Sequence, residues 1–446
     1  MASYLYRNSP VPTSEKKFTF STWLKMSDAS TSADNGIVEW YKSSSERYQI
    51  LIDSATRQLR LYAVEAGAVK ATIYSNMVFR DTNAWYHIVI HSDTTQSSSS
   101  DAFKLWVNGS AQTFSSYTWS YNQNVNVNVF DGSGTKLNLG TRGEAYATWL
   151  NGYLADTYYI DGSLIAYTEF GETDSTTGEW KPNTQPTISS FGNAGVHLKY
   201  ENSGTIGLDS SGNTNNFTAS GTVTQTKDCP SNVFATLNPL YQQTTGEGVV
   251  LMNGNTRCYY NPDSSRSAFG TIAVGTGKYY YEAECETAGT GPVVGVVDLA
   301  WGGINGAAGA FHDNALNFGY SSSGVKTSGG VNTAYGDTFT TGDIIGVAID
   351  KTNNKLYFAK NGVWQNSGDP TSGATGTGSA FNLASDTLYT SACRMRNGGD
   401  WKFNFGNGYF GTTAISSEGT NASGNGKFEY DVPTGYTALS TKGLNE

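Results

Sequence analysis

Apolar and polar residues alternate in a series of short segments through the first third of the chain. The segment 18–26 (FTFSTWLKM) places Phe18, Phe20 and Leu24 on one face, as in a β-strand with one buried side. The segment 124–130 (NVNVNVF) alternates asparagine with valine, which predicts a strand with one wet and one dry face. Strand-like spacing recurs at 47–53, 58–64 and 85–93.

The segment 85–93 (WYHIVIHSD) predicts a strand that carries two histidines on the same face. One face holds Tyr86, Ile88 and Ile90, and the other holds Trp85, His87, Val89 and His91. Four residues of strand separate the two histidines by about 13 Å, which is too far for them to share a metal ion.

The stretch 342–368 predicts a β-hairpin in the second half of the chain. The apolar run IIGVAID is followed by the polar turn KTNN and by a second strand, KLYFAKNG. In that second strand Leu356 and Phe358 fall on one face and Tyr357 on the other. The dipeptide Asn361-Gly362 predicts a further turn, because both residues readily adopt a positive φ.

Length and composition indicate a multidomain all-β protein. A chain of 446 residues is too long for one ordinary core, so two or three domains are expected. It contains 52 glycines, 13% aromatic residues and only 15% charged residues, a profile that favours short strands joined by tight turns. Long runs with helical spacing are absent.

Charge and cysteine content exclude several classes of function. A net charge of −10, without any cluster of lysine and arginine, argues against a nucleic-acid partner. Residues 1–20 lack the apolar core of a signal peptide, and no window approaches 18 apolar residues, so no membrane insertion is expected. The four cysteines lie far apart without a CxxC pair, which favours buried free thiols over disulfides or metal ligands.

Several motifs in the first part of the chain resemble a known family. They are W-x-H-I-V, L-W-V-N-G, L-x-L-G and G-Y-L-A-D, the last followed by a strand and an Asp-Gly turn. Over about residues 15–172 the sequence thus resembles the laminin-G-like branch of the concanavalin A-like lectin/glucanase fold. The phrases FRDTNAWYHIVIHSDTTQ and FGETDSTTGEWKPN are more specific, and they resemble laminin-G-like virion proteins of marine tailed phages.

The second half resembles the SPRY domain over about residues 232–440. The motifs are the GD-x-IG-x-x-x-D strand, the strand that ends in F-x-x-NG, and the closing phrase YDVPTGYTAL. The Gly/Ala-rich segment 300–314 departs from the family, which usually has a more regular strand and loop there. The resemblances imply an all-β fold of two antiparallel β-sandwiches of jelly-roll type in tandem, with a turn-rich junction.

The expected domains are a first sandwich at 1–172, a junction at 173–231 and a SPRY-like sandwich at 232–446. Within the junction, GVHLKYEN predicts one strand, which we expect to pack on the first domain. A flexible linker is the alternative.

A glucanase-like fold raises the hypothesis of glycoside hydrolysis. That reaction needs two carboxylates on opposite sides of the scissile bond, about 5–5.5 Å apart for retention. The nearest pattern is Glu172 and Asp174, followed by Glu179, but it lies in a turn region and not on an apolar strand. The spacing therefore does not predict a catalytic pair, and we expect no enzymatic activity.

Other chemistry finds little support in the sequence. No GxSxG, P-loop or dinucleotide-binding pattern is present. Laminin-G-like sandwiches sometimes hold calcium at a loop rim, for which Asp131 and Asp156 are the candidates. No other cofactor is expected.

Recognition of a ligand by surface loops remains. Carbohydrate binding needs exposed aromatic faces together with amide and carboxylate groups. Trp364 follows the Asn361-Gly362 turn and Trp401 starts a strand, and both positions favour a structural role. Trp and Tyr in sandwiches lie mostly in the core, so a core position is the favoured alternative for each of the other aromatic candidates as well. The candidate ligand-binding residues are Arg142, Glu144, Tyr146 and Trp149 in the first domain and Trp301, His312, Tyr335 and Arg396 in the second.

The resemblance implies a non-enzymatic phage virion protein, a tail fibre, adhesin or surface appendage that binds host-surface glycans. The alternative is a structural capsid decoration or tail connector that contacts other virion proteins. Either protein would be made in the host cytoplasm and would lie on the virion surface, at the tail or the capsid. Phage fibres are frequently trimers, but heptads and collagen-like repeats are absent, so any homo-oligomer would form through sandwich surfaces.

Overall fold

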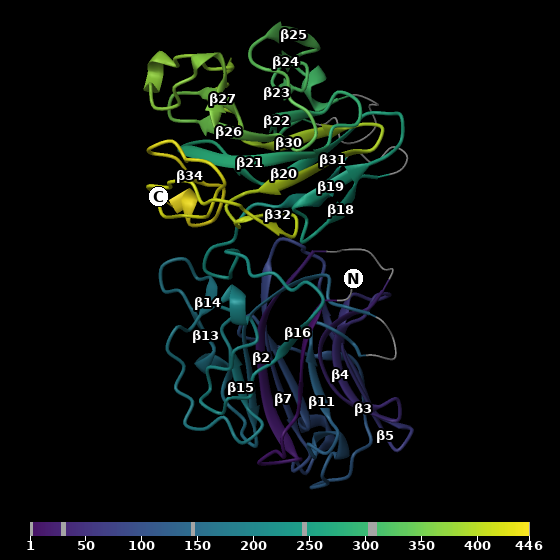
Figure 1. Ribbon diagram of the computed structural model, residues 1–446. Helices are drawn as coiled ribbons and strands as arrows, with labels where there is room; N and C mark the ends of the chain where they lie inside the picture. Colours follow the sequence, from purple (N-terminus) through teal and green to yellow (C-terminus); the bar gives the residue numbers. More distant parts are fainter. Residues whose placement is uncertain (1–2, 28–32, 144–147, 243–247, 302–309, 446) are drawn as a thin grey trace. The chain divides into compact units, whose positions relative to one another are not determined.

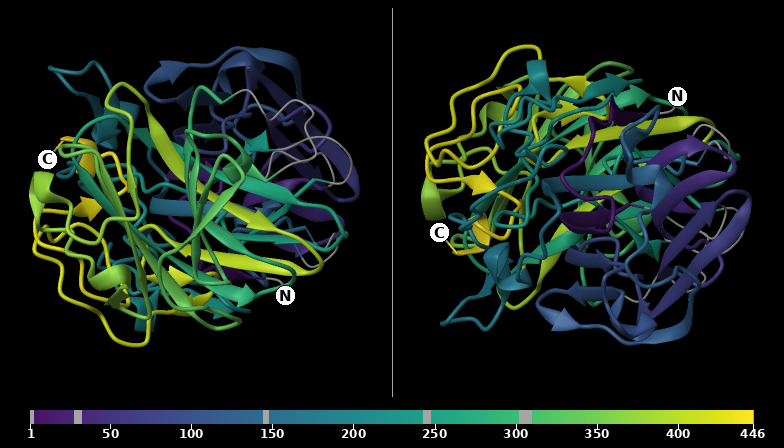
Figure 2. Two further views of the ribbon diagram at one scale, coloured as in Figure 1. Left: turned by 90° about the horizontal axis from the view of Figure 1, so that it is seen from above. Right: turned by 90° about the horizontal axis from the view of Figure 1, so that it is seen from below.

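The computed structural model describes residues 3–27, 33–143, 148–242, 248–301 and 310–445. It divides into two compact units, Met1–Gln225 and Thr226–Glu446. Strands, loops and short 3₁₀ turns make up the described backbone, in which there is no α-helix (Figures 1 and 2). This confirms the all-β prediction. Within the described residues, no helix is long and apolar enough to cross a membrane.

The first unit contains two antiparallel sheets and a small hairpin, β13 (Gly171–Thr173) with β14 (Trp180–Pro182). The eight-stranded sheet has the order β10 (Phe114–Trp119), β6 (Ala68–Val78), β5 (Gln58–Glu65), β4 (Glu46–Ile52), β3 (Asn35–Ser43), β11 (Lys136–Leu139), β1 (Tyr4–Asn8) and β16 (Thr218–Ser220). The six-stranded sheet has the order β15 (Val196–Leu198), β12 (Gly152–Asp161), β2 (Lys17–Met26), β7 (Trp85–Asp93), β8 (Phe103–Val107) and β9 (Ser110–Ala111).

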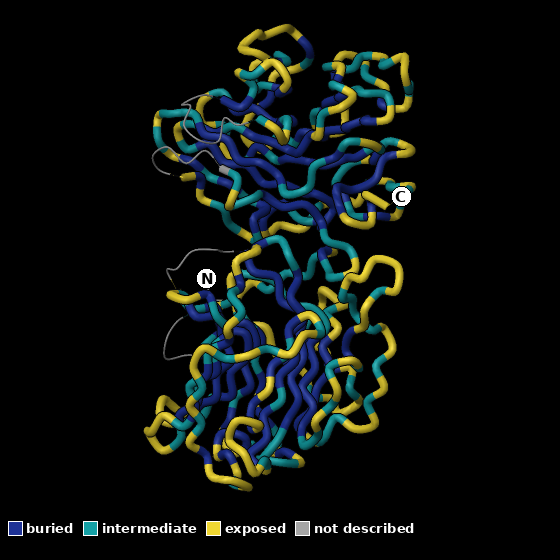
Figure 3. The backbone as a smooth tube through the Cα atoms, turned by 180° about the vertical axis from the view of Figure 1, so that it is seen from behind, coloured by how far each residue is buried: buried dark blue, intermediate teal, exposed yellow. Residues whose placement is uncertain are grey.

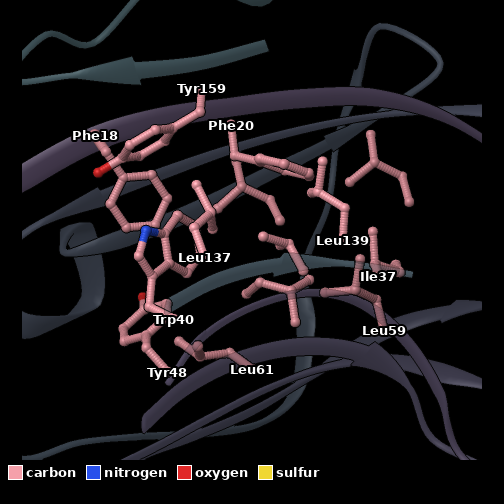
Figure 4. Packing of buried hydrophobic residues seen from close by; sticks show 14 of the residues in the cluster. Phe18, Phe20, Ile37, Trp40, Tyr48, Leu59, Leu61, Leu137, Leu139 and Tyr159 are labelled. Carbon is pink, nitrogen blue, oxygen red and sulfur yellow. The ribbon is translucent and has the colours of Figure 1, made fainter. Parts of the chain in front are cut away.

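Aromatic rings pack together in the core of the first unit, beside aliphatic side chains (Figure 4). The Trp40 ring lies 4.8 Å from Phe18, 5.9 Å from Tyr48, 5.5 Å from Phe130 and 5.3 Å from Tyr159, centroid to centroid. Phe18, Trp40, Tyr48 and Tyr159 come from four different strands, and Phe130 comes from a 3₁₀ turn. All five side chains are nearly free of solvent contact. Edge-to-face arrangements of this kind add to the stabilisation that burial of apolar surface provides.

The alternation in 124–130 does not produce a strand. The segment runs as a loop and ends in a 3₁₀ turn, η2 (Asn128–Phe130). Val127 and Val129 are buried in the core while Asn128 is exposed, so the wet and dry sides are as predicted. The backbone N–H of Val127 donates to Glu15 O at 3.0 Å, outside any sheet ladder. The alternation of apolar and polar residues therefore indicates here which side of the segment is buried, although the segment pairs with no strand.

Two strands from the region 173–225 belong to the sheets of the first unit. β15 pairs with β12, with Val196 opposite Tyr159, and β16 pairs with β1, with Ser220 opposite Tyr4. Both ladders are antiparallel. This part of the chain is therefore joined to the first unit by sheet hydrogen bonds.

The second unit also contains two large sheets. The seven-stranded sheet has the order β17 (Leu237–Gln242), β20 (Arg266–Val274), β30 (Tyr389–Met395), β22 (Val293–Asp298), β23 (Phe318–Ser321), β24 (Val325–Ser328) and β25 (Val331–Ala334). The nine-stranded sheet has the order β18 (Val250–Met252), β19 (Arg257–Tyr260), β31 (Gly399–Asn404), β21 (Lys278–Thr287), β26 (Ile344–Asp350), β27 (Lys355–Lys360) and β28 (Val363–Trp364), with β29 (Phe381–Asn382) on β27 and β34 (Thr437–Ala438) on β21. A small hairpin joins β32 (Tyr409–Phe410) to β33 (Thr413–Ala414).

The predicted hairpin at 342–368 lies within the nine-stranded sheet as β26 and β27. Leu356 and Phe358 enter the main core, whereas Tyr357 joins a second buried cluster on the other face, as the spacing predicted. Asn361 and Gly362 have φ of 48° and 79° and form the expected turn. In Figure 3 most buried residues lie on the strands, and most exposed residues lie on the loops between them.

The first and last segments of the second unit lie beside each other. The N–H of Ala235 donates to Leu439 O at 2.8 Å, and the N–H of Thr441 donates to Val233 O at 2.9 Å. The second unit therefore closes on itself.

A buried carboxylate holds the segment that leads to this closure. Glu282 of β21 accepts hydrogen bonds from the N–H groups of Glu429 (2.9 Å) and Tyr430 (2.8 Å) and from Asn404 Nδ2 (3.1 Å). Burial raises the pKa of Glu282 from 4.5 to about 7. Between pH 4.5 and about pH 7, the folded protein therefore holds a proton at Glu282 that the unfolded chain has lost.

This raised pKa makes the stability of the second unit depend on pH. The contribution of Glu282 is greatest below its unfolded pKa and is lost as the pH rises toward 7, because only the folded state holds the proton in that window. Glu282→Gln cannot titrate. The free-energy advantage of the natural chain over this variant should therefore fall, by on the order of 2 kcal/mol, between pH 5 and pH 8 in urea unfolding followed by tryptophan fluorescence. An advantage that does not change with pH would contradict the assignment.

Candidate functional site

The first unit has a pocket of about 380 Å³ beside the β13–β14 hairpin. Its walls come from the turn between β8 and β9, from the 3₁₀ turn η3 (Tyr167–Glu169), and from both strands of the hairpin. The side chains that matter most for its chemistry are those of Asn108, Tyr167, Glu172 and Trp180. This volume lies within the range of about 300–1,000 Å³ that small-molecule sites occupy.

Two glycines determine where the Trp180 indole can lie. A Cβ atom at Gly109 would come within 2.5 Å of a ring carbon, and one at Gly171 would come within 2.6 Å of the same ring system. Gly109 also has a φ of 74°, as the second residue of the Asn-Gly turn. The indole can therefore occupy this place only because both neighbours lack a side chain.

A buried histidine lies behind the indole. Trp180 Nε1 donates to His87 Nδ1 at 3.0 Å, and His87 Nε2 lies 2.9 Å from Ser21 Oγ. Trp23 stacks on the imidazole, with the ring centroids 4.7 Å apart. Burial lowers the pKa of His87 to about 3, so the ring is neutral near pH 7. Because Nδ1 accepts a hydrogen bond, the proton lies on Nε2 and is donated to Ser21.

Further aromatic residues extend from the pocket over the outer face of the six-stranded sheet. Tyr167 lies 6.0 Å from Trp180 and stacks on Trp106 at 5.5 Å, and Trp106 in turn lies 4.7 Å from His91. Trp180, Tyr167, Trp106 and His91 are all only partly buried. The outward face of β7, which the alternation assigned to His87 and His91, thus carries part of this aromatic row.

Polar groups lie on the rim of the pocket. Asn108 Oδ1 accepts from the N–H of His87 at 2.7 Å, which fixes the side chain, and the amide NH₂ group has no hydrogen-bond partner among the described residues. Glu172 Oε1 lies 3.4 Å from Lys181 Nζ on the neighbouring strand. The pocket thus combines aromatic faces with an amide donor and a carboxylate acceptor.

The acidic residues of the hairpin do not have the features of a hydrolase pair. The N–H of Thr177, the Lys181 ammonium and the N–H of Thr176 all bond to Asp174, and together they hold its pKa well below the usual range. Such a carboxyl has no proton to give near neutral pH, whereas a glycosidase requires one carboxylic acid of raised pKa.

The candidates predicted in the loop 141–149 lie apart from this pocket. Arg142 forms an ion pair with Asp34 and is largely buried, so its guanidinium is engaged within the protein. Trp149 is 40% exposed and remains available to a partner. Glu144 and Tyr146 lie outside the described residues.

The four candidates of the second unit are scattered. Tyr335 is only 7% exposed and belongs to the core, and Arg396 pairs with Asp263 at 2.6 Å. Trp301 packs on a small buried cluster, and burial lowers the pKa of His312 to about 4. As far as the described residues show, no hydrogen bond, ion pair or ring contact joins any two of these four. Residues 302–309 of the Gly/Ala-rich segment are not described.

Each of the two calcium candidates contacts a lysine or histidine side chain of the protein. Asp131 lies 2.8 Å from Lys42 Nζ, and Asp156 lies 2.8 Å from His197 Nε2. Among the residues that the structure describes, no group of three or more acidic, histidine or cysteine side chains could hold a metal ion.

Comparison with known proteins identifies both units. Residues 2–166 match the family described as the concanavalin A-like lectin/glucanases superfamily, and residues 278–408 match the SPRY domain. The chain therefore contains a concanavalin A-like domain followed by a SPRY domain. This confirms the two family resemblances that the sequence motifs carried.

Similarity to individual proteins is lower and covers only part of the chain. The ATP-dependent RNA helicase DDX1 of Xenopus laevis is 29% identical over 139 residues, which are 30% of this chain and 16% of that protein. Among solved structures, the SPRY domain of human HERC1 is 16% identical with a TM-score of 0.29, covering 37% of this chain and 96% of that one. Stonustoxin is 17% identical with a TM-score of 0.29, covering 40% of this chain and 27% of the toxin.

The arrangement around His87 predicts a specific spectroscopic signature. The imidazole should remain neutral, as the Nε2–H tautomer, down to about pH 4, because burial disfavours its charged form. Nitrogen-15 chemical shifts of the histidine side chains, followed from pH 8 to pH 4, would show this directly. Titration of His87 near pH 6.5, or the Nδ1–H tautomer, would contradict the hydrogen bond from Trp180.

Proposed function

We propose that this chain is a non-enzymatic carbohydrate-binding protein, and that its first domain holds a sugar in the pocket at Trp180. The observation that carries the proposal is the combination of aromatic and polar groups around one small cavity. The partly buried rings of Trp180 and Tyr167 can pack against the C–H faces of a pyranose. The amide of Asn108 and the carboxylate of Glu172 can bond to its hydroxyl groups.

The family matches support a binding role in general terms. A concanavalin A-like domain and a SPRY domain fit a non-catalytic binding protein. We further propose a virion setting, supported by phrases such as FRDTNAWYHIVIHSDTTQ that resemble laminin-G-like phage proteins. In that setting the protein is an appendage on the tail or capsid surface, and its ligand is a glycan of the host surface.

The second domain favours an additional contact with protein. Strand β25 (Val331–Ala334) lies at the edge of the seven-stranded sheet, and all four of its residues are exposed, Val331 by 66%. An open edge strand can accept a strand from a partner through backbone hydrogen bonds. This supports the alternative of a structural decoration or connector, in which other virion proteins are the partners.

Trp180→Ala tests the proposed sugar site. The substitution should weaken binding of host-surface polysaccharide at least about tenfold, because it removes the main aromatic surface of the pocket. Trp149→Ala is the matched control, since Trp149 is exposed in a loop outside the pocket. Isothermal titration calorimetry with fragments of the polysaccharide would measure both affinities, after circular dichroism has shown that both variants are folded.

Three outcomes separate the proposals. Loss of binding in Trp180→Ala alone supports the pocket, and loss in Trp149→Ala alone moves the site to the loop 141–149. Release of reducing sugar by the natural chain, abolished by Glu172→Gln, would instead show a hydrolase. An intact chain that binds no host polysaccharide but captures other virion proteins would favour the structural alternative.

A further inference from the structure

The charges around the pocket at Trp180 are mainly negative. Among its lining residues the one charged side chain is Glu172. Lys181 is the nearby cation, but its Nζ lies 3.4 Å from Glu172 and 3.0 Å from Asp174, so two carboxylates offset one positive charge. Glu179 adds a further exposed carboxylate to the same hairpin.

We propose, on the basis of the proposed function, that this pocket selects sugars without an anionic group. A uronate or sulfate in the pocket would bring a second negative charge close to Glu172, with no uncommitted cation among the lining residues to receive it. A neutral or amino sugar avoids this repulsion, and its hydroxyl or ammonium hydrogens can bond to the Glu172 carboxylate. If the anionic group of the sugar lay about 6 Å from the Glu172 carboxylate in a partly solvated site, the repulsion would weaken its binding roughly tenfold relative to the neutral sugar at low salt.

Pairs of sugars that differ only in charge test this selection. Suitable probes are methyl glucoside with methyl glucuronide, and N-acetylglucosamine with its 6-sulfate, titrated by calorimetry at 20 mM and 300 mM salt. The neutral member should bind about tenfold more tightly at low salt, and the difference should shrink at high salt. Glu172→Gln should reduce the preference severalfold. Glu179→Gln makes the same change in net charge outside the pocket lining and should leave the preference intact.

The result distinguishes this inference from the function on which it rests. Equal or tighter binding of the anionic members would overturn the selection while leaving the sugar site in place. A preference that responds equally to Glu172→Gln and Glu179→Gln would also overturn it, because long-range charge would then be the cause. Failure of both members of every pair to bind would remove the sugar site itself.

A second, independent observation concerns two buried cysteines of the SPRY domain. Cys258 of β19 and Cys393 of β30 belong to different sheets, yet their Sγ atoms lie only 3.4 Å apart. Both side chains are fully buried, and burial raises the pKa of the Cys258 thiol. In the structure both are free thiols.

We propose that Cys258 and Cys393 form a redox-sensitive pair that closes to a disulfide between the two sheets. A disulfide has an S–S distance of about 2.05 Å, so the two sulfurs need to approach by only about 1.3 Å. In the reaction the two thiols lose two protons and two electrons to a small disulfide such as oxidised glutathione, which is reduced to two thiols. The bond would link positions 135 residues apart and would shift the unfolding midpoint of the domain upward.

Cys285 provides a matched control on the same sheet. In the nine-stranded sheet Trp401 lies between Cys258 and Cys285, directly opposite each in its ladder. Cys285 is likewise fully buried, but strand β31, which carries Trp401, lies between it and Cys258. Replacement of Cys285 should therefore leave the oxidation of the pair unchanged.

The experiment compares oxidised and reduced forms of each full-length variant. The chain is refolded in a glutathione buffer, which gives the oxidant access to the buried thiols, and is then mapped by mass spectrometry under non-reducing conditions. We expect a peptide that joins Cys258 to Cys393 and an unfolding midpoint about 10 °C above that of the reduced chain. The shift should persist in Cys285→Ala and disappear in Cys393→Ala.

Because each variant is compared with its own reduced form, a loss of stability from the substitution itself does not affect the test. Absence of the joined peptide after refolding in oxidising buffer would overturn the proposal. A shift of equal size in Cys393→Ala would overturn it as well.

Discussion

The pocket of the first domain depends on keeping His87 neutral inside the protein. The imidazole accepts from Trp180 on one side and donates to Ser21 on the other, so a single hydrogen-bonded line joins the hairpin to the sheet. A charged imidazole would lose its acceptor and leave the indole N–H without a partner, at a cost of about 1–3 kcal/mol. The burial that lowers the pKa of His87 therefore also preserves the hydrogen bond that orients the Trp180 ring at the pocket.

The remaining parts of the site follow from backbone constraints. Gly109 and Gly171 leave room for the indole, and the Asn-Gly turn directs Asn108 toward both His87 and the pocket. The two strands of the hairpin are short, and Asp174 stabilises the turn between them by accepting two backbone N–H groups and the Lys181 ammonium. Asp174 thus has a structural role in this hairpin, which accounts for an acidic residue at the start of the turn.

Most of the fold could be predicted from the sequence, because alternation reports directly which side of a strand is buried. It predicted correctly that Tyr357 and Leu356 lie on opposite faces of their strand, and that His87 and Ile88 do so on theirs. It failed at 124–130, where the same alternation marks a loop lying on the core, since burial on one side does not require a neighbouring strand. The pocket could not be predicted in this way, because Trp180 meets a histidine 93 positions earlier and no local pattern records that contact. The available signal was indirect: an aromatic residue next to a turn, and glycines at positions that open space for it.

The closure of the second unit on itself has an evolutionary consequence. Its first segment, at Ala235, and its last, at Leu439, are hydrogen-bonded neighbours. A domain whose two ends lie side by side can be inserted into a loop of another protein without forcing the two ends of that loop apart. It can equally be attached to the end of another protein. The SPRY unit thus has the geometry of an exchangeable module, which gene rearrangement could move between proteins while its core and its buried Glu282 network stay intact.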